Sequence, residues 1–140
     1  MRKVLFVVLA GSLAGCSSVQ VKPLSASNRI EHVCIERNDK VIVEDFLSVL
    51  DQGFKSRGIS TQIYDGAAPA GCEYTVNYVA HKAWDMKPYL KDAEIEIRHN
   101  GEVVSSGKLH TADGLQPSKW DSTEEKMRPV IDQMFAGLRS

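Results

Sequence analysis

One apolar stripe in the first half of the chain constrains the fold more than any other feature. Its members recur at spacings of three, four, seven and eleven residues, the pattern of one buried helix face: Val43, Phe46, Leu47, Leu50 and Phe54. Gly58 suits a left-handed cap and Ile59 the hydrophobic contact that accompanies it, so we predict a helix over about 42–57. Strand-like segments at 30–36 and 60–64 flank this helix. A strand, a helix and a strand in this order predict a right-handed crossover with the two strands parallel.

The rest of the chain continues with alternating segments and a second helix. Residues 74–81 and 93–98 alternate apolar and polar side chains, as half-buried strands do. Asn100-Gly101 predicts a type I′ turn, from which residues 102–109 return antiparallel. A second apolar stripe runs over 127–138, and Ser122 with Glu125 fits a capping box that would start this helix near 122. Pro129 would then lie inside the helix and kink it; alternatively, Pro129 opens the main helix.

Together these elements predict an α+β fold, a two-layer sandwich with a β-α-β-β-β-β-like order. Two amphipathic helices would pack on one face of a mixed, mostly antiparallel sheet, because each helix and each strand has one apolar face to bury. The other face of the sheet would be solvated. The chain has 140 residues, which suffices for a single domain, and we place that domain at 30–140.

The first residues have the pattern of a secretory leader. Arg2 and Lys3 precede an aliphatic run that is too short to cross a hydrocarbon layer ~30 Å thick, and small residues follow it. We therefore predict that residues 1–15 are a signal peptide that is removed. Residues 17–29 are polar, small and non-periodic and contain Pro23, so we interpret residues 16–29 as a tether.

The leader ends in Leu13-Ala14-Gly15-Cys16, which resembles the lipobox of bacterial lipoproteins. The resemblance implies that Cys16 becomes an N-terminus carrying acyl chains such as palmitate. Two or more such chains anchor a protein stably, whereas one holds it only marginally. Ser17 stands where an aspartate would favour the inner membrane, so the resemblance implies the periplasmic face of the outer membrane.

The charge of the chain argues against polyanionic partners. Removal of Arg2 and Lys3 with the leader leaves 15 of the 17 cationic side chains against 18 acidic ones. A net negative charge disfavours nucleic acid, so we expect no nucleic-acid partner. The partners we expect are the membrane, through the lipid anchor, and an envelope protein.

Two cysteines remain besides Cys16, and an even number in an oxidising compartment predicts a disulfide. We expect Cys34 and Cys72 to be bonded, although they lie 38 positions apart. The alternative is a catalytic thiolate at Cys34, with His32 or His81 and with Asp85. That set competes with the disulfide, because a nucleophilic thiolate must be free.

Other signatures of chemistry are weak. The sequence contains no Gly-rich phosphate loop, no paired-cysteine metal motif and no His-Glu-x-x-His segment. His81 and His110 could meet across antiparallel strands, and Asp85 or Asp113 could complete a metal site, but nothing in the spacing requires one. We therefore expect no metal, no cofactor and no enzymatic activity.

The segment 81–91 is unusual for a connection between two strands. It carries Trp84, Tyr89 and several lysines, where small polar residues are the norm, and Trp120 lies beside a lysine just before the last helix. Aromatic rings near cations can form a glycan-stacking or protein-docking surface, which makes these three rings candidate binding residues. The alternative is that the tryptophans cover the end of the sheet and keep their NH groups in water.

Several motifs together resemble a family of small proteobacterial lipoproteins with a lipobox and a paired-cysteine α/β domain. They are the cysteine in the first strand, Arg57-Gly58-Ile59, Ala68-Pro69-Ala70-Gly71-Cys72, Ala83-Trp84-Asp85-Met86-x-Pro88-Tyr89-Leu90, Lys119-Trp120 and Lys126-Met127-x-Pro129-Val130-Ile131-Asp132. The resemblance implies no catalytic residues. We expect a non-enzymatic interaction or accessory lipoprotein of the cell envelope; the alternatives are a small-ligand or glycan binder that uses the loop aromatics and, third, an envelope hydrolase.

Overall fold

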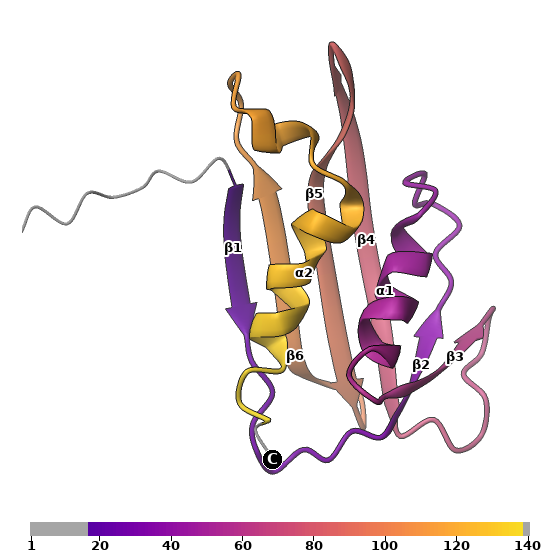
Figure 1. Ribbon diagram of the computed structural model, residues 1–140. Helices are drawn as coiled ribbons and strands as arrows, with labels where there is room; N and C mark the ends of the chain where they lie inside the picture. Colours follow the sequence, from indigo (N-terminus) through magenta and orange to yellow (C-terminus); the bar gives the residue numbers. More distant parts are fainter. Residues whose placement is uncertain (1–16, 139–140) are drawn as a thin grey trace, which may run out of the picture.

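The computed structural model describes residues 17–138, which form one six-stranded sheet with two helices on one of its faces (Figure 1). The strand order across the sheet is β1-β6-β5-β4-β2-β3. The strands are β1 (Ser17–Lys22), β2 (His32–Glu36), β3 (Ser60–Tyr64), β4 (Tyr74–Asp85), β5 (Lys87–His99) and β6 (Glu102–Thr111). The helices are α1 (Phe46–Lys55), α2 (Thr123–Met134) and a short 3₁₀ helix, η1 (Pro117–Trp120). The expected α+β class and two-layer arrangement are confirmed. The expected order of elements is incomplete, because it does not include the first strand, β1.

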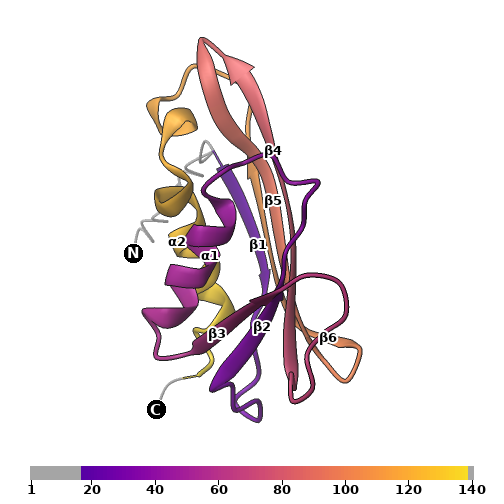
Figure 2. The same cartoon turned by 90° about the vertical axis from the view of Figure 1, so that its right-hand side faces the viewer.

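The core lies between the helices and the sheet (Figure 2). Three side chains of α1 and four of α2 are at most 2% exposed: Phe46, Leu50, Phe54, Met127, Val130, Ile131 and Met134. They pack with sheet residues such as Val76, Ile95 and Ile97, which are fully buried. The alternate residues of β4 and β5 are half-buried or exposed, so one face of the sheet is solvated, as antiparallel sheets allow.

The β2-α1-β3 unit follows the sequence closely. β2 pairs with β3 in parallel register over five residues. Gly58 has φ 76° and the Ile59 N–H donates to the Phe54 carbonyl at 3.1 Å, so the predicted cap is present. The helix begins at Phe46 rather than at 42. Asp45 occupies the N-cap position without a side-chain capping bond, and its carboxylate accepts a hydrogen bond from the Thr123 hydroxyl instead.

The interpretation of residues 16–29 as a tether is wrong for the part that the structure describes. Residues 17–22 form β1, which pairs antiparallel with β6 along its whole length. Leu24 is only 2% exposed, and its N–H donates to the Met134 carbonyl at 2.9 Å. The folded domain therefore includes residues 17–29 and does not start at Ile30. A free edge on β6 supplies the main-chain partners that this short polar segment lacks by itself.

The expected connection over residues 81–91 is also wrong, because it continues both strands. β4 and β5 pair antiparallel from Tyr74↔His99 as far as Asp85↔Lys87, with a register shift after His81. Met86, with φ 63°, makes the turn between them. The main-chain ladder extends through a polar and aromatic composition because its hydrogen bonds do not depend on the side chains.

The last helix shows the predicted capping box, in which the Ser122 side chain accepts from the Glu125 N–H and the Glu125 carboxylate accepts from the Ser122 N–H. Pro129 lies inside α2, which settles the two alternatives in favour of a single helix. Pro129 and Glu125 are both exposed, so water can reach the carbonyl that the missing N–H leaves without a partner.

Among residues 17–138, no helix is long and apolar enough to cross a membrane.

Candidate functional site

Two parts of the chain meet at one end of the sheet, which we call the hairpin end: residues 82–91, and the loop 112–116 with η1, which follows it directly. Lys119 connects them, because its Nζ donates to Asp85 Oδ2 at 2.6 Å and to the Gly114 carbonyl at 3.2 Å. The hydrogen bond from Lys119 to Asp85 raises the pKa of the Lys119 ammonium. The indole of Trp120 adds a further bond, from Nε1 to the Asp85 carbonyl at 2.9 Å.

A second lysine, Lys126 of α2, is buried directly beneath this group. Its Nζ donates to the Leu90 carbonyl at 2.9 Å, to Thr111 Oγ1 at 3.1 Å and to the Lys119 carbonyl at 2.5 Å. Burial lowers the pKa of Lys126 because it disfavours the charged form. All three donors of the ammonium are thus used, and the role of Lys126 is to join α2 to β5, β6 and η1.

Sequence reasoning missed both lysines as parts of this site. The helix periodicity could have predicted the burial of Lys126, because this residue lies three positions after Thr123 and four before Val130, on the face of α2 that carries the buried residues. No periodic pattern could have predicted the burial of Lys119, because η1 is a single turn. Only the contact with the β4–β5 hairpin accounts for its burial.

The three candidate aromatic residues do not form one surface. Trp84 is 74% exposed, Tyr89 is 8% exposed and Trp120 is half-buried. Trp84 pairs with Pro88 and Tyr89 with Ala83, and neighbouring positions on a strand point to opposite faces, so Trp84 and Tyr89 point away from each other. The interpretation that a tryptophan covers the end of the sheet fits Trp120 and not Trp84.

Tyr89 and Trp120 do come together. Both line an open pocket of about 550 Å³ with Lys82 and with the residues that precede α1 and α2. The ammonium of Lys119 lies 4.8 Å from the centre of the Tyr89 ring and that of Lys126 lies 5.4 Å from it, so the ring is already engaged by cations of the protein. Of the two aromatic residues in this pocket, Trp120 is therefore the one more available to a ligand.

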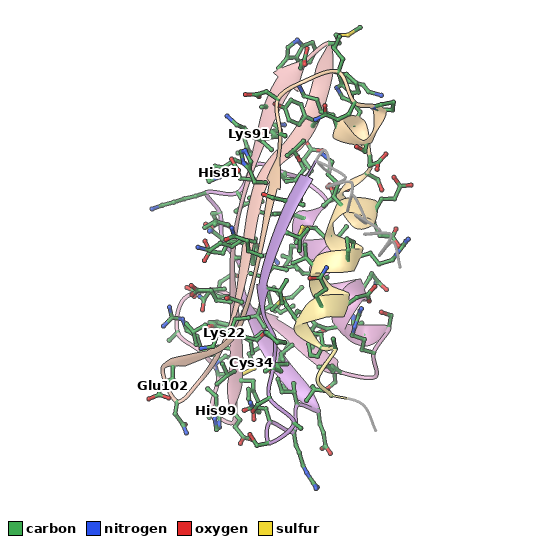
Figure 3. The ribbon with its side chains drawn as sticks, turned by 90° about the vertical axis from the view of Figure 1, so that its left-hand side faces the viewer. Lys22, Cys34, His81, Lys91, His99 and Glu102 are labelled. Carbon is green, nitrogen blue, oxygen red and sulfur yellow. A yellow bond between two sulfur atoms is a disulfide. The ribbon has the colours of Figure 1, made fainter. Side chains whose placement is uncertain are left out.

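His81 and His110 lie on the solvated face, where Figure 3 shows His81 on the side of the sheet away from the helices, whereas His99 stacks on the buried Tyr74 ring. His110 Nδ1 lies 2.5 Å from Asp92 Oδ1, and His81 lies opposite Asp92 in the β4–β5 register. Of the two carboxylates considered as a third metal ligand, Asp85 is bound to Lys119, and Asp113 is exposed in the loop after β6. Within residues 17–138, no three His, Cys, Asp or Glu side chains converge as a metal site requires.

The predicted disulfide is present between Cys34 and Cys72, whose Cα atoms are 5.8 Å apart. Cys34 is fully buried in β2, and its Sγ lies 3.7 Å from His32 Nε2. Because the sulfur is bonded, the alternative of a nucleophilic Cys34 thiolate is wrong for this state of the protein. The predicted lipidation site, Cys16, lies outside the described residues.

The most exposed large apolar side chains of residues 17–138 also lie at the hairpin end. Trp84 is 74%, Met86 78% and Leu115 80% exposed, and the other exposed apolar side chains range from 37% to 63%. Single exposed apolar residues are normal on protein surfaces, but the grouping of these three at one end is a specific feature.

Comparison with known proteins bears on the fold alone. No family model and no curated protein matches the chain. Among solved structures, it is similar to the PelC dodecamer from Paraburkholderia phytofirmans, with a TM-score of 0.59 and 14% sequence identity, covering 88% of this chain and 99% of that one. A dodecamer of a single-substitution variant of the same protein matches with a TM-score of 0.55 and 17% identity, covering 81% and 96% of the two chains. The chain thus shares the fold of that dodecameric protein, and at this identity the likeness carries no residue roles.

Proposed function

We propose that the protein is a lipoprotein of the cell envelope, anchored through Cys16 to the periplasmic face of the outer membrane, and that it acts as a non-enzymatic interaction or accessory module. The observation that carries this proposal is the disulfide between Cys34, which is fully buried, and Cys72, which is half-buried. A disulfide in a small domain persists in an oxidising compartment, and the leader with its lipobox-like end provides the route to one.

Two further features support an interaction role. One whole face of the sheet is solvated, which offers an extended surface of mixed polarity. The solved structures with the same fold are dodecamers, so this architecture is compatible with assembly into larger particles. The edge strands β1 and β3 are short and each is paired on one side only, so they provide free main-chain groups for such contacts.

The anchor is tested by intact mass spectrometry of the mature protein and by fractionation of the envelope. We expect a mass that corresponds to residues 16–140 with a diacylglycerol and a further acyl chain, recovered with the outer membrane. The Cys16→Ser variant is the control and should lose both the added mass and the membrane fraction. An unmodified Cys16 in the native protein would overturn the proposal.

The interaction role is tested by crosslinking in intact cells. A photo-reactive residue at Val79, which is 43% exposed on β4, samples the solvated face, and one at Arg128, which is exposed on α2 on the other side of the sheet, serves as the matched control. We expect a discrete crosslinked species from position 79, either with a second copy or with one envelope protein. Equal, diffuse labelling from both positions would contradict the proposal.

A small-ligand or glycan binder remains the second candidate, because Tyr89 and Trp120 line the same pocket. Its test is the fluorescence of Trp120 in a Trp84→Phe variant during titration with cell-wall fragments. A saturable change would favour this candidate, and a flat response would leave the interaction module as the better account.

A further inference from the structure

We propose that the β4–β5 hairpin tip is a membrane-contact element, with Trp84 and Met86 seated in the interfacial region of the bilayer. This inference rests on the proposed anchor for its orientation, but the contact itself depends on the tip alone. The tip combines three properties that the rest of residues 17–138 does not combine: exposed apolar side chains, nearby cations, and a position at the end where the chain enters the domain.

The apolar side chains are presented and not packed. Trp84 and Met86 are 74% and 78% exposed, and Leu115 in the neighbouring loop is 80% exposed. The Lys119 ammonium holds the two segments together through Asp85 and the Gly114 carbonyl. An indole and flexible apolar chains at one end of a rigid hairpin suit the boundary between headgroups and acyl chains, where tryptophan is enriched.

The charges near the tip favour a headgroup layer over the apolar surface of a protein. Lys82 and Lys87 are exposed, and Lys91 is half-buried on the side of the sheet away from the helices (Figure 3). Of the nearby acids, Asp85 is paired with Lys119, while Asp113 in the adjacent loop is exposed. Lysine stems can lie along the interface while their ammonium groups bind phosphates.

The orientation follows from β1. Ser17 pairs with Thr111, so the residue that follows Cys16 lies at the same end of the sheet as the hairpin tip (Figure 1). Lys91 of β5 lies level with Thr111 and therefore with Ser17. From Lys91 to Lys87 the hairpin extends past Ser17 by roughly 13 Å, at ~3.3 Å per residue. With the domain beginning at Ser17, a lipid on Cys16 and the tip can touch one membrane surface together, and that surface meets the sheet obliquely.

The test uses the full-length protein, produced with its own leader and reconstituted into phosphatidylethanolamine and phosphatidylglycerol vesicles that carry brominated acyl chains. In the Trp120→Phe variant the fluorescence comes from Trp84. We expect a blue shift on vesicle binding, quenching by bromines near the headgroups, and protection from aqueous acrylamide. The matched control is Trp84→Phe, whose half-buried Trp120 should show neither lipid quenching nor a shift.

Each outcome decides one question. If Trp84 stays accessible to acrylamide on lipidated, vesicle-bound protein, the tip proposal is overturned while the anchor stands. If Trp84 is protected from acrylamide but not quenched by lipid bromines, it is buried against protein, which also overturns the tip proposal. If mass spectrometry of the same sample finds no lipid on Cys16 and Trp84 is nevertheless quenched by bromines, the tip proposal stands and the proposed anchor fails. If Cys16 carries no lipid and the protein does not bind the vesicles, both fail.

Discussion

At the scale of single residues, the buried polar side chains are satisfied by long-range contacts. Lys126 illustrates this: it is buried, and its ammonium donates to β5, β6 and η1 at once. Asp51 is half-buried and combines a local partner, Lys55 of its own helix, with Thr61 of β3. Each of the two residues gives a prediction about stability.

Replacement of Lys126 by Met should destabilise the protein by about 1–3 kcal/mol, because it leaves buried carbonyl acceptors without a donor while it keeps most of the apolar stem. The matched control is Arg128→Met on the same helix, whose side chain is exposed and pairs only with Glu124, and which should change stability by less than about 0.5 kcal/mol. Urea unfolding of the two variants measures the difference. Equal effects would show that the ammonium of Lys126 is not part of the core.

Asp51 should make stability sensitive to acid. Burial raises its pKa, but hydrogen bonds from Lys55 and Thr61 and the charge of Lys55 outweigh that effect and lower the pKa from the usual 3.8. A depressed pKa in the folded state means stabilisation above the unfolded value that is lost as the pH falls through the folded value. We expect Asp51→Asn to unfold at lower urea than the native protein at neutral pH, with the gap narrowing below pH ~3.8. A gap that stays constant with pH would contradict the assignment.

At the scale of elements, β1 and the outer half of the hairpin are the two parts of the sheet whose sequences did not predict strands, and main-chain pairing places them there. Their sequences are short or polar, so their stability comes from their neighbours. β1 is the clearer case, because Leu24 immediately after it is buried in the core.

Leu24→Ala should cost about 2–5 kcal/mol, the usual range for a buried Leu. Arg29→Ala, an exposed change in the same N-terminal segment, should be close to neutral. Chemical denaturation compares the two. A neutral Leu24→Ala would mean that residues 17–24 behave as a tether after all.

The disulfide joins β2 to the loop before β4, and it should contribute about 4 kcal/mol, as the chain-entropy model gives for a loop closed over 38 positions. The Cys34→Ala, Cys72→Ala double variant should therefore unfold at markedly lower urea than the oxidised protein and should be insensitive to reductant. The native protein treated with reductant is the matched comparison. Unchanged stability in both would show that the loop is held by other contacts.

At the scale of the whole molecule, one core serves every element, because both helices pack on the same face of one sheet (Figure 2). The hairpin end is tied into that core through Lys126 and η1. We expect a single cooperative unfolding transition, with far-ultraviolet circular dichroism and Trp120 fluorescence in the Trp84→Phe variant giving the same midpoint. An earlier midpoint for Trp120 would show that the hairpin end unfolds separately.

Much of the fold follows from local patterns. The α1 stripe, the Gly58 cap, the Asn100-Gly101 turn, the capping box at Ser122 and the pairing of two remaining cysteines are each encoded within a few residues or by elimination. The structure confirms the turn directly, since Asn100 and Gly101 both have positive φ. The α+β class follows from these elements because one-faced helices and strands have few ways to bury their apolar sides.

The sequence by itself determined the amphipathic helices, the turns, the cysteine pair and the class of fold, since each depends on side chains close together in the chain. Only the tertiary structure decided that residues 17–22 are a strand, that the hairpin runs on to Met86, and that Trp84 is presented while Tyr89 and Lys126 are buried. The physical reason is that these features rest on main-chain hydrogen bonds and packing between residues tens of positions apart. Such contacts produce no periodic pattern of apolar residues in the sequence.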